Sequence, residues 1–226
     1  MASDLRVMLE KGPKGKKVVA VAPDWPGLAR GAKSKKEAIE RLRAYIPRYS
    51  PVAKLADMSM KFDSIKNLHV VEQYEGTPST DFWGISFAFS KIDKQAMSAK
   101  ELARELALMQ ACWAFFDSVR TRVSAKMLEG KRGGGRDREQ IVRHIFVNEQ
   151  QWAKKLGVIT PDKAMLSKAG LKTHRDAYCR AIREYHSQGM MAGKVAKWPL
   201  RYLIRHTAFH TMDHAWEMED KDLTAA

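Results

Sequence analysis

The pattern of apolar and polar positions divides the chain into a β-rich first part and a helical second part. From about residue 98, apolar residues recur every three or four positions, a spacing that places them on one face of a helix. Four segments show this period, at 99–126, 137–156, 168–188 and 199–221. The stripe of the first segment is made by Leu102, Leu106, Met109, Trp113 and Phe116. Four such helices with short to moderate loops predict an antiparallel, up-and-down four-helix bundle.

The beginning of the chain predicts a small α/β unit. The β-prone runs 5–9 and 17–21 are joined by the turn-forming residues 11–15, and residues 28–31 make a third short run. These three runs are expected to form strands of a small sheet.

A helix is expected to follow the third run. Ser34 and Glu37 have the spacing of a capping box, in which two side chains satisfy free backbone N–H groups at the start of a helix. Pro47 and Pro51 are expected to disturb or end this helix, because proline lacks the N–H group that a helix interior uses.

Residues 63–93 are expected to be extended. β-branched and aromatic residues gather in the runs 65–73 and 80–90. The segment either completes the small sheet or leads the chain across to the helices. The whole pattern predicts an α+β fold in three parts: a ββ(β)α domain in 1–60, an extended connecting segment in 61–96 and the helical bundle in 97–226.

Composition limits the classes of protein that fit this pattern. The chain has 226 residues, 45% of them hydrophobic, and no apolar run is long enough to span a bilayer. The first residues lack the apolar core of a signal peptide. Cys112 and Cys179 belong to no CxxC pair, so we expect free, buried thiols in a reducing compartment. A cytoplasmic protein that makes no membrane contact is the expectation.

The formal net charge of +14 changes the picture only a little. Such a charge suits nucleic acid, anionic membranes and acidic small molecules alike. Basic clusters occur at 14–17, 33–36 and 131–138, but basic residues are present in every segment and no RRM, KH or zinc-finger signature accompanies them. A solvated basic surface is the favoured interpretation, with nucleic-acid binding as the alternative.

Candidate chemistry gathers in the last expected helix, where His206, His210 and His214 stand four residues apart. This spacing places neighbouring histidines on one helix face, where an adjacent pair can share a metal ion. The outer two start roughly 12 Å apart along a helix axis, whereas a zinc–nitrogen bond measures only about 2.0–2.1 Å. One adjacent pair is therefore expected to bind, and His210 belongs to both candidate pairs.

A further ligand must come from another helix, and His144 is the candidate. It shares the apolar stripe of the second expected helix with Ile141, Ile145, Asn148 and Trp152. A buried histidine without a partner is costly, and a metal ion would use it. The alternative is a core histidine that is hydrogen-bonded to a backbone carbonyl group. The remaining histidines occupy strand-like or polar positions and are expected on the surface; they are His69, His174 and His186.

Two carboxylates lie close to the histidine face of the last expected helix. Asp213 either orients a ligand imidazole, as carboxylates behind metal ligands do, or forms a surface salt bridge. Glu217 is close to one turn beyond His214 and is a candidate extra ligand or base.

The helical part resembles the DinB/YfiT-like superfamily of four-helix bundles. The resemblance rests on the second helix, where hydrophobic residues stand shortly before His144 and where Glu149 and Trp152 follow, on the ladder of three histidines, and on the order of the segments. It covers roughly residues 97–221 and implies a metal site made by His144, His210 and His214, with His206 as an accessory residue. Many members carry His-Arg-Gly-Gln at the final ligand, whereas this chain has His-Ala-Trp-Glu at 214–217.

The N-terminal part resembles the HicB-like antitoxin domain over about residues 5–50. In that domain a strand leads into a Pro-Asp-hydrophobic-Pro-Gly turn, a short strand and a helix that starts with Glu-Ala. The matching residues are Ala22 to Gly27, Gly31 and the pair Glu37-Ala38. The resemblance implies a structural likeness only, because a helical bundle stands where antitoxins carry their DNA-binding tail.

Two functions from different classes follow. The first is a metal-dependent enzyme, since three histidines leave positions open for water or substrate. The DinB-like resemblance implies thiol transfer or hydrolysis of a small-molecule substrate, a low-molecular-weight thiol as cosubstrate, and a homodimer. Zn and Ni are the favoured divalent ions, although imidazole also suits Cu and Fe. The second is a non-enzymatic binding or regulatory protein whose HicB-like domain contacts a protein or nucleic acid through 14–17 and 33–36.

Overall fold

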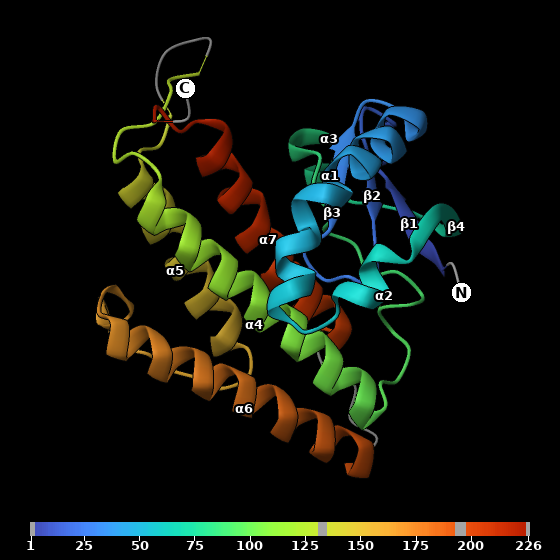
Figure 1. Cartoon of the computed structure of the whole chain (residues 1–226). Coiled ribbons are helices and arrows are strands. Elements are labelled where there is room, and N and C mark those ends of the chain that lie inside the picture. The colour runs from blue at the N-terminus through green and yellow to red at the C-terminus, as the bar shows by residue number, and fades with distance from the viewer. Residues whose placement is uncertain (1–2, 131–134, 193–197, 225–226) are drawn as a thin grey trace.

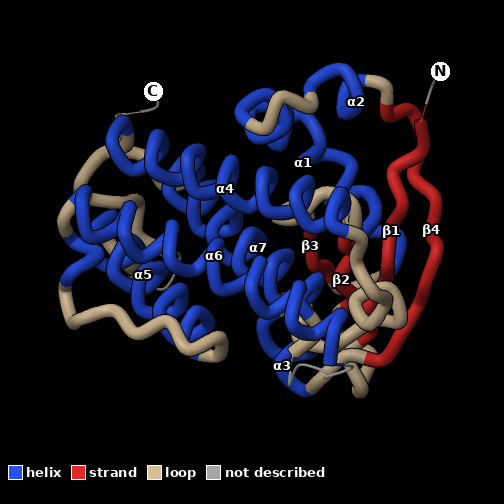
Figure 2. Tube along the Cα trace, turned by 90° about the horizontal axis from the view of Figure 1, so that it is seen from below, coloured by secondary structure: helices blue, strands red, loops and turns tan. Residues whose placement is uncertain are grey.

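The computed structural model describes residues 3–130, 135–192 and 198–224. It has an α+β fold, in which a small sheet near the N-terminus is followed by helices (Figures 1 and 2). Part of the basic cluster at 131–138 lies outside the described residues. Within the described ranges, no helix combines the length and apolar character that crossing a membrane requires.

The sheet has four strands in the order β3-β2-β1-β4. Strands β1 (Ser3–Lys11), β2 (Val18–Val21) and β3 (Ala29–Ala32) pair in antiparallel fashion, whereas β4 (Ile65–Glu75) pairs with β1 in parallel. The three strands expected at the N-terminus are confirmed. Because β4 joins the same sheet, the first half of the segment expected to be extended does complete the sheet.

The second half of that segment is a helix and a loop, so the extended structure expected at 80–90 is wrong. Helix α3 (Pro78–Trp83) begins after Thr77, whose N–H group donates to the hydroxyl of Thr80 at 3.0 Å. Pro78 occupies the first turn, where a missing N–H group costs nothing. Local capping therefore overrides the β preference of the aromatic residues that follow.

The loop after α3 is held by a buried carboxylate instead of a strand partner. Glu10 of β1 is fully buried and accepts hydrogen bonds from the N–H groups of Phe87 (3.0 Å) and Ala88 (3.3 Å). The hydroxyl groups of Ser86 and Thr80 also donate to this carboxylate. Backbone groups that a strand would satisfy through a ladder are satisfied here by one side chain.

Helix α1 (Lys35–Leu55) begins where its capping signal predicts, and the Ser34 hydroxyl accepts from the N–H of Glu37 at 3.2 Å. The helix then continues through Pro47 and Pro51, so of the two outcomes expected for these prolines, the end of the helix is not found. Figure 1 shows that α1 changes direction along its length, as proline-containing helices do. Tyr49 is fully buried and donates to the carbonyl of Pro26 at 2.6 Å, and this packing offsets the lost helix hydrogen bonds.

The sheet is covered on both faces, because side chains alternate along each strand. Leu5, Val7 and Leu9 of β1 belong to a buried cluster that includes Leu42 of α1. Met8 points the other way and joins a second cluster with Phe209 of helix α7. The last helix therefore packs directly against the sheet, although it lies at the far end of the sequence.

The remaining helices are those that the periodicity predicts. They are α4 (Ala99–Arg122), α5 (Arg138–Lys154), α6 (Lys168–Ala192) and α7 (Leu200–Asp220). The structure adds the short helix α2 (Ser59–Asp63) and a 3₁₀ turn (Ala164–Leu166). Capping boxes start two of them, between Ser98 and Glu101 in α4 and between Asp137 and Gln140 in α5. The predicted stripe of α4 is buried along its whole length.

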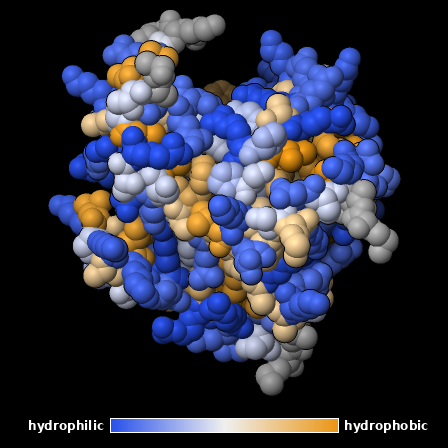
Figure 3. All heavy atoms as spheres, in the orientation of Figure 1, coloured by the Kyte–Doolittle hydropathy of each residue, from blue (hydrophilic) through white to orange (hydrophobic). Residues whose placement is uncertain are grey.

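A buried ionic group connects three of these helices. Arg175 of α6 donates to Glu149 of α5 at 3.0 Å and to Asp117 of α4 at 2.7 Å. The apolar cluster around it runs without a break into the sheet region. On the outside, hydrophilic residues cover most of the face shown in Figure 3, and apolar residues are confined to patches between them.

A close backbone contact between β3 and the loop after α3 gives a first prediction. A Cβ atom added at Gly31 would lie 2.0 Å from the carbonyl oxygen of Gly84. We expect Gly31→Ala to lower the free energy of unfolding by about 1–3 kcal/mol, because the backbone must move apart. Urea unfolding followed by circular dichroism measures this, with Ala32→Ser on the same strand as the control. An unchanged midpoint for Gly31→Ala would contradict the contact.

Candidate metal centre

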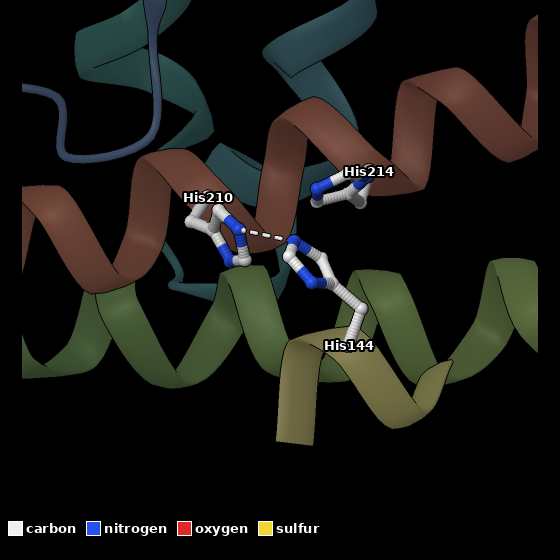
Figure 4. Close-up of side chains that lie close together, drawn as sticks. All are labelled: His144, His210 and His214. Atoms are coloured by element: carbon white, nitrogen blue, oxygen red, sulfur yellow. Dashed lines mark hydrogen bonds between the residues drawn. The ribbon is translucent and has the colours of Figure 1, made fainter. Parts of the chain in front are cut away.

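Three histidines, two on α7 and one on the neighbouring helix α5, lie close together. His210 and His214 come from α7 and His144 from α5, and a ligand nitrogen of each lies within 4.8 Å of the other two (Figure 4). The Nε2 atoms of His144 and His210 are 3.1 Å apart. The structure therefore brings together the three residues that the sequence analysis singled out, here called the histidine triad.

The geometry of α7 decides which histidines can meet. His210 and His214 are one turn apart, and their ring centroids lie 4.7 Å from each other. His206, one turn earlier, is outside the group and stacks on Tyr202 with ring centroids 5.1 Å apart and an interplanar angle of 15°. Its ring also meets the edge of Trp152 at 5.0 Å. As the axial spacing predicts, His206 and His214, the outer two histidines of α7, do not belong to one group in the fold.

Glu217 holds His214 in place. Its Oε2 atom lies 2.6 Å from Nδ1 of His214, one turn along the same helix, and Lys221 binds its other oxygen. The hydrogen bond to His214 is the main cause that lowers the pKa of Glu217 to about 2. With Nδ1 engaged by a carboxylate, His214 presents Nε2 to the triad. Glu217 is a candidate base or a candidate for supporting a ligand, and its contact with Nδ1 has the geometry of a carboxylate that orients an imidazole from behind.

Asp213 does not orient an imidazole. It forms an ion pair with Arg30 of β3, whose side chain is buried, so the salt-bridge alternative is the one found. The pair joins the sheet to α7, with the Arg30 side chain buried and the Asp213 side chain 38% exposed. Arg30 also lies over the rings of Tyr45 and Trp216, at 3.8 and 4.3 Å from their centroids. The sequence gives no signal for this arginine, because a lone basic residue in a strand is usually solvated.

Burial favours the neutral form of His144 and His210. Desolvation lowers the pKa of His144 to about 4, with a further contribution from the charge of His214. It lowers the pKa of His210 well below its usual range, and the neighbouring histidines add to the effect. The neutral imidazole is the form that binds a metal ion, and each of these two side chains keeps one unprotonated ring nitrogen at neutral pH.

The Nδ1 atoms of His144 and His210 lack a carboxylate partner like the one that His214 has in Glu217. The Nδ1 atom of His210 is buried, and the described residues offer it no hydrogen-bond partner. Asn148 lies 3.4 Å from Nδ1 of His144 and donates to the carbonyl of the same residue at 2.8 Å. Trp152 packs its edge against His210, with ring centroids 5.1 Å apart. The triad is therefore positioned by one carboxylate, one amide and an aromatic wall.

The remaining histidines do not all lie on the surface as expected. His69 is exposed on β4. His174 is buried, and its Nδ1 atom lies 2.6 Å from the hydroxyl of Thr160, so the surface position expected for it is wrong. His186 is half-buried, with Nε2 at 2.7 Å from the carbonyl oxygen of Met97. Neither of the latter two reaches the triad.

The cysteines are free and buried, as expected. Burial raises the pKa of Cys179 to about 11 and raises that of Cys112 further, so neither offers a thiolate at neutral pH.

Comparisons with protein-family models, with curated proteins and with solved structures give no match. The two family resemblances therefore stay predictions, and the function must be argued from the site itself.

Proposed function

We propose that the histidine triad binds a divalent metal ion. The observation that carries the proposal is the meeting of His144, His210 and His214 nitrogens within 4.8 Å from two separate helices. Ligand atoms around a tetrahedral ion with bonds of about 2.0–2.1 Å are about 3.3 Å apart. The 3.1 Å between Nε2 of His144 and Nε2 of His210 is close to that value. Zn and Ni are the ions that we favour for an imidazole set of this kind.

A site with three protein ligands leaves coordination positions open, which is typical of catalytic metal sites. We therefore favour a metal-dependent enzyme that transfers a thiol or hydrolyses a small substrate, with a low-molecular-weight thiol as cosubstrate. When bound, the ion would activate water or a thiol and polarise an electrophile. Arg136 is exposed, and its positive charge contributes to the low pKa of His144 and His210. An anionic group on the substrate would suit this arginine.

The proposed architecture of the helical part is an antiparallel four-helix bundle of the DinB-like kind, made by α4 to α7. The contacts of Arg175 with α4 and α5 support it. The hydroxyls of Tyr178 in α6 and Thr207 in α7, 3.1 Å apart, support it as well. A homodimer is part of the same proposal.

Turnover is the test of the enzymatic proposal. Metal-loaded protein is assayed with thiol–electrophile pairs and with activated esters, beside His210→Ala and the matched control His69→Ala. Metal-dependent turnover that is lost only in His210→Ala supports an enzyme. Salt-sensitive binding of nucleic acid that His210→Ala leaves unchanged, without turnover, would instead favour a binding protein that uses its N-terminal part.

A further inference from the structure

A basic pocket lies between the sheet and α7, on a face of α7 other than the one that carries the triad. Its volume is about 350 Å³. Its wall is made by strand β3, by Lys17 just before β2, by helix α1, by the end of α3 with the two residues that follow, and by helix α7. The side chains that give it its character are Lys17, Arg30, Lys33, Arg41, Trp83 and Asp213.

The pocket carries more positive than negative charge. Arg30 is neutralised by Asp213. Within the described ranges, Lys17, Lys33 and Arg41 have no carboxylate within ion-pair distance. Uncompensated lysine and arginine donors of this kind match the oxygens of a phosphate group.

Two of the cations are held in position by backbone carbonyl groups. The Nζ atom of Lys17 donates to the carbonyl of Phe82 at 2.6 Å, and Nη1 of Arg41 donates to that of Gly31 at 3.1 Å. These contacts use one donor of each side chain and leave its charge uncompensated. The pocket is therefore largely preformed for an anion, which reduces the entropy lost on binding.

An aromatic wall stands beside these cations. Trp83 is 65% exposed and its neighbour Phe82 68% exposed, although both are large apolar side chains. Their rings meet edge to face with centroids 4.5 Å apart, so Phe82 supports the indole from the side. An exposed indole offers its face to a planar ring, as in proteins that stack the bases of nucleic acids.

We propose that this pocket binds the phosphate group of a nucleotide while the base stacks on Trp83. The proposal is independent of the metal centre. A second hollow of about 720 Å³ shares Lys33 and is also lined by Lys11 and Lys35, so further phosphates of a strand would meet further cations there. The shared chemistry is a phosphate next to a planar base, whether free or within a single strand.

Calorimetric titration at low ionic strength with inorganic phosphate, adenosine and adenosine monophosphate tests the proposal. We expect the nucleotide to bind more tightly than either fragment. Trp83→Ala should weaken nucleotide binding by about 5- to 100-fold and leave inorganic phosphate unchanged, because only the stacking is lost. Lys33→Gln and Arg41→Gln should weaken both phosphate and nucleotide by about tenfold.

Arg43→Gln is the matched control, because it removes the same charge from α1 at a residue that lines a different hollow. It should leave both affinities unchanged. If a thymidine decanucleotide binds more tightly than adenosine monophosphate, and Lys35→Gln weakens this binding, the natural ligand is a single strand. If the two ligands bind with equal affinity, the natural ligand is a free nucleotide. Absence of saturable nucleotide binding at millimolar concentration, or an equal loss in Arg43→Gln, overturns the proposal. Metal content, measured in parallel, should stay the same in all these variants.

Discussion

Protein purified without an affinity tag is expected to bind one divalent ion per chain, and His144→Ala, His210→Ala and His214→Ala should each abolish stoichiometric binding. Loss of a residue behind a ligand typically weakens metal affinity by about 10- to 100-fold, so loss of a ligand should cost at least about 100-fold. Glu217→Gln, which keeps the size of the side chain but removes the carboxylate beside His214, should fall in the smaller range. Elemental analysis and competition with a metallochromic chelator measure both effects.

Two other histidine variants separate the triad from its surroundings. His69→Ala removes an exposed histidine on β4 and should leave metal content unchanged. His206→Gln should also retain the ion, because His206 lies one turn outside the group and packs on Tyr202. If His144→Ala and His214→Ala both still bind stoichiometric metal, the proposed site is wrong. The proposal is also wrong if added Zn and Ni leave the melting temperature of the wild-type protein unchanged.

The parts of the fold that the sequence predicts are those governed by local chemistry and periodicity. Four long helices follow from apolar stripes, and the capping signal at Ser34 marks a helix start that the structure confirms. Errors arise where a tertiary contact overrides a local rule. Helix α1 passes two prolines because the buried Tyr49 anchors its second half. Residues 80–90 lack strand structure because the carboxylate of Glu10 takes over their hydrogen bonds.

The site shows the same division. The i, i+4 spacing and the axial distance limit could be worked out on α7 alone, but they allow either adjacent pair of histidines. The fold places His144 beside His210 and His214 and leaves His206 outside the group. The partners of the two carboxylates of Asp213 and Glu217 could not be predicted, because they depend on which elements lie alongside α7. Asp213 turns to Arg30, a residue 183 positions earlier, and Glu217 is left to hold His214. No pattern within one helix encodes which of two neighbouring acids meets a strand.

Removal of one buried arginine should destabilise the whole molecule. Arg205 of α7 is 3% exposed and binds the carboxylate of Asp93 with both Nε (2.6 Å) and Nη2 (2.7 Å). It also donates to the Ser86 hydroxyl at 3.0 Å, and Ser86 in turn donates to Glu10 of the sheet. Through these contacts the loop after α3 is fastened to the sheet on one side and to α7 on the other.

We expect Arg205→Ala to lower the free energy of unfolding by about 3–5 kcal/mol, because Asp93 keeps a buried charge without its cation. Arg122→Ala removes an arginine from a more exposed pair with Glu219 and should cost about 0–1 kcal/mol. Urea unfolding measures both. A double variant, Arg205→Met with Asp93→Leu, should recover part of the loss, since it removes both buried charges together. If Arg205→Ala unfolds at the same urea concentration as Arg122→Ala, the loop after α3 is held by its apolar contacts alone. The proposed stabilisation by the ion pair of Arg205 with Asp93 is then wrong.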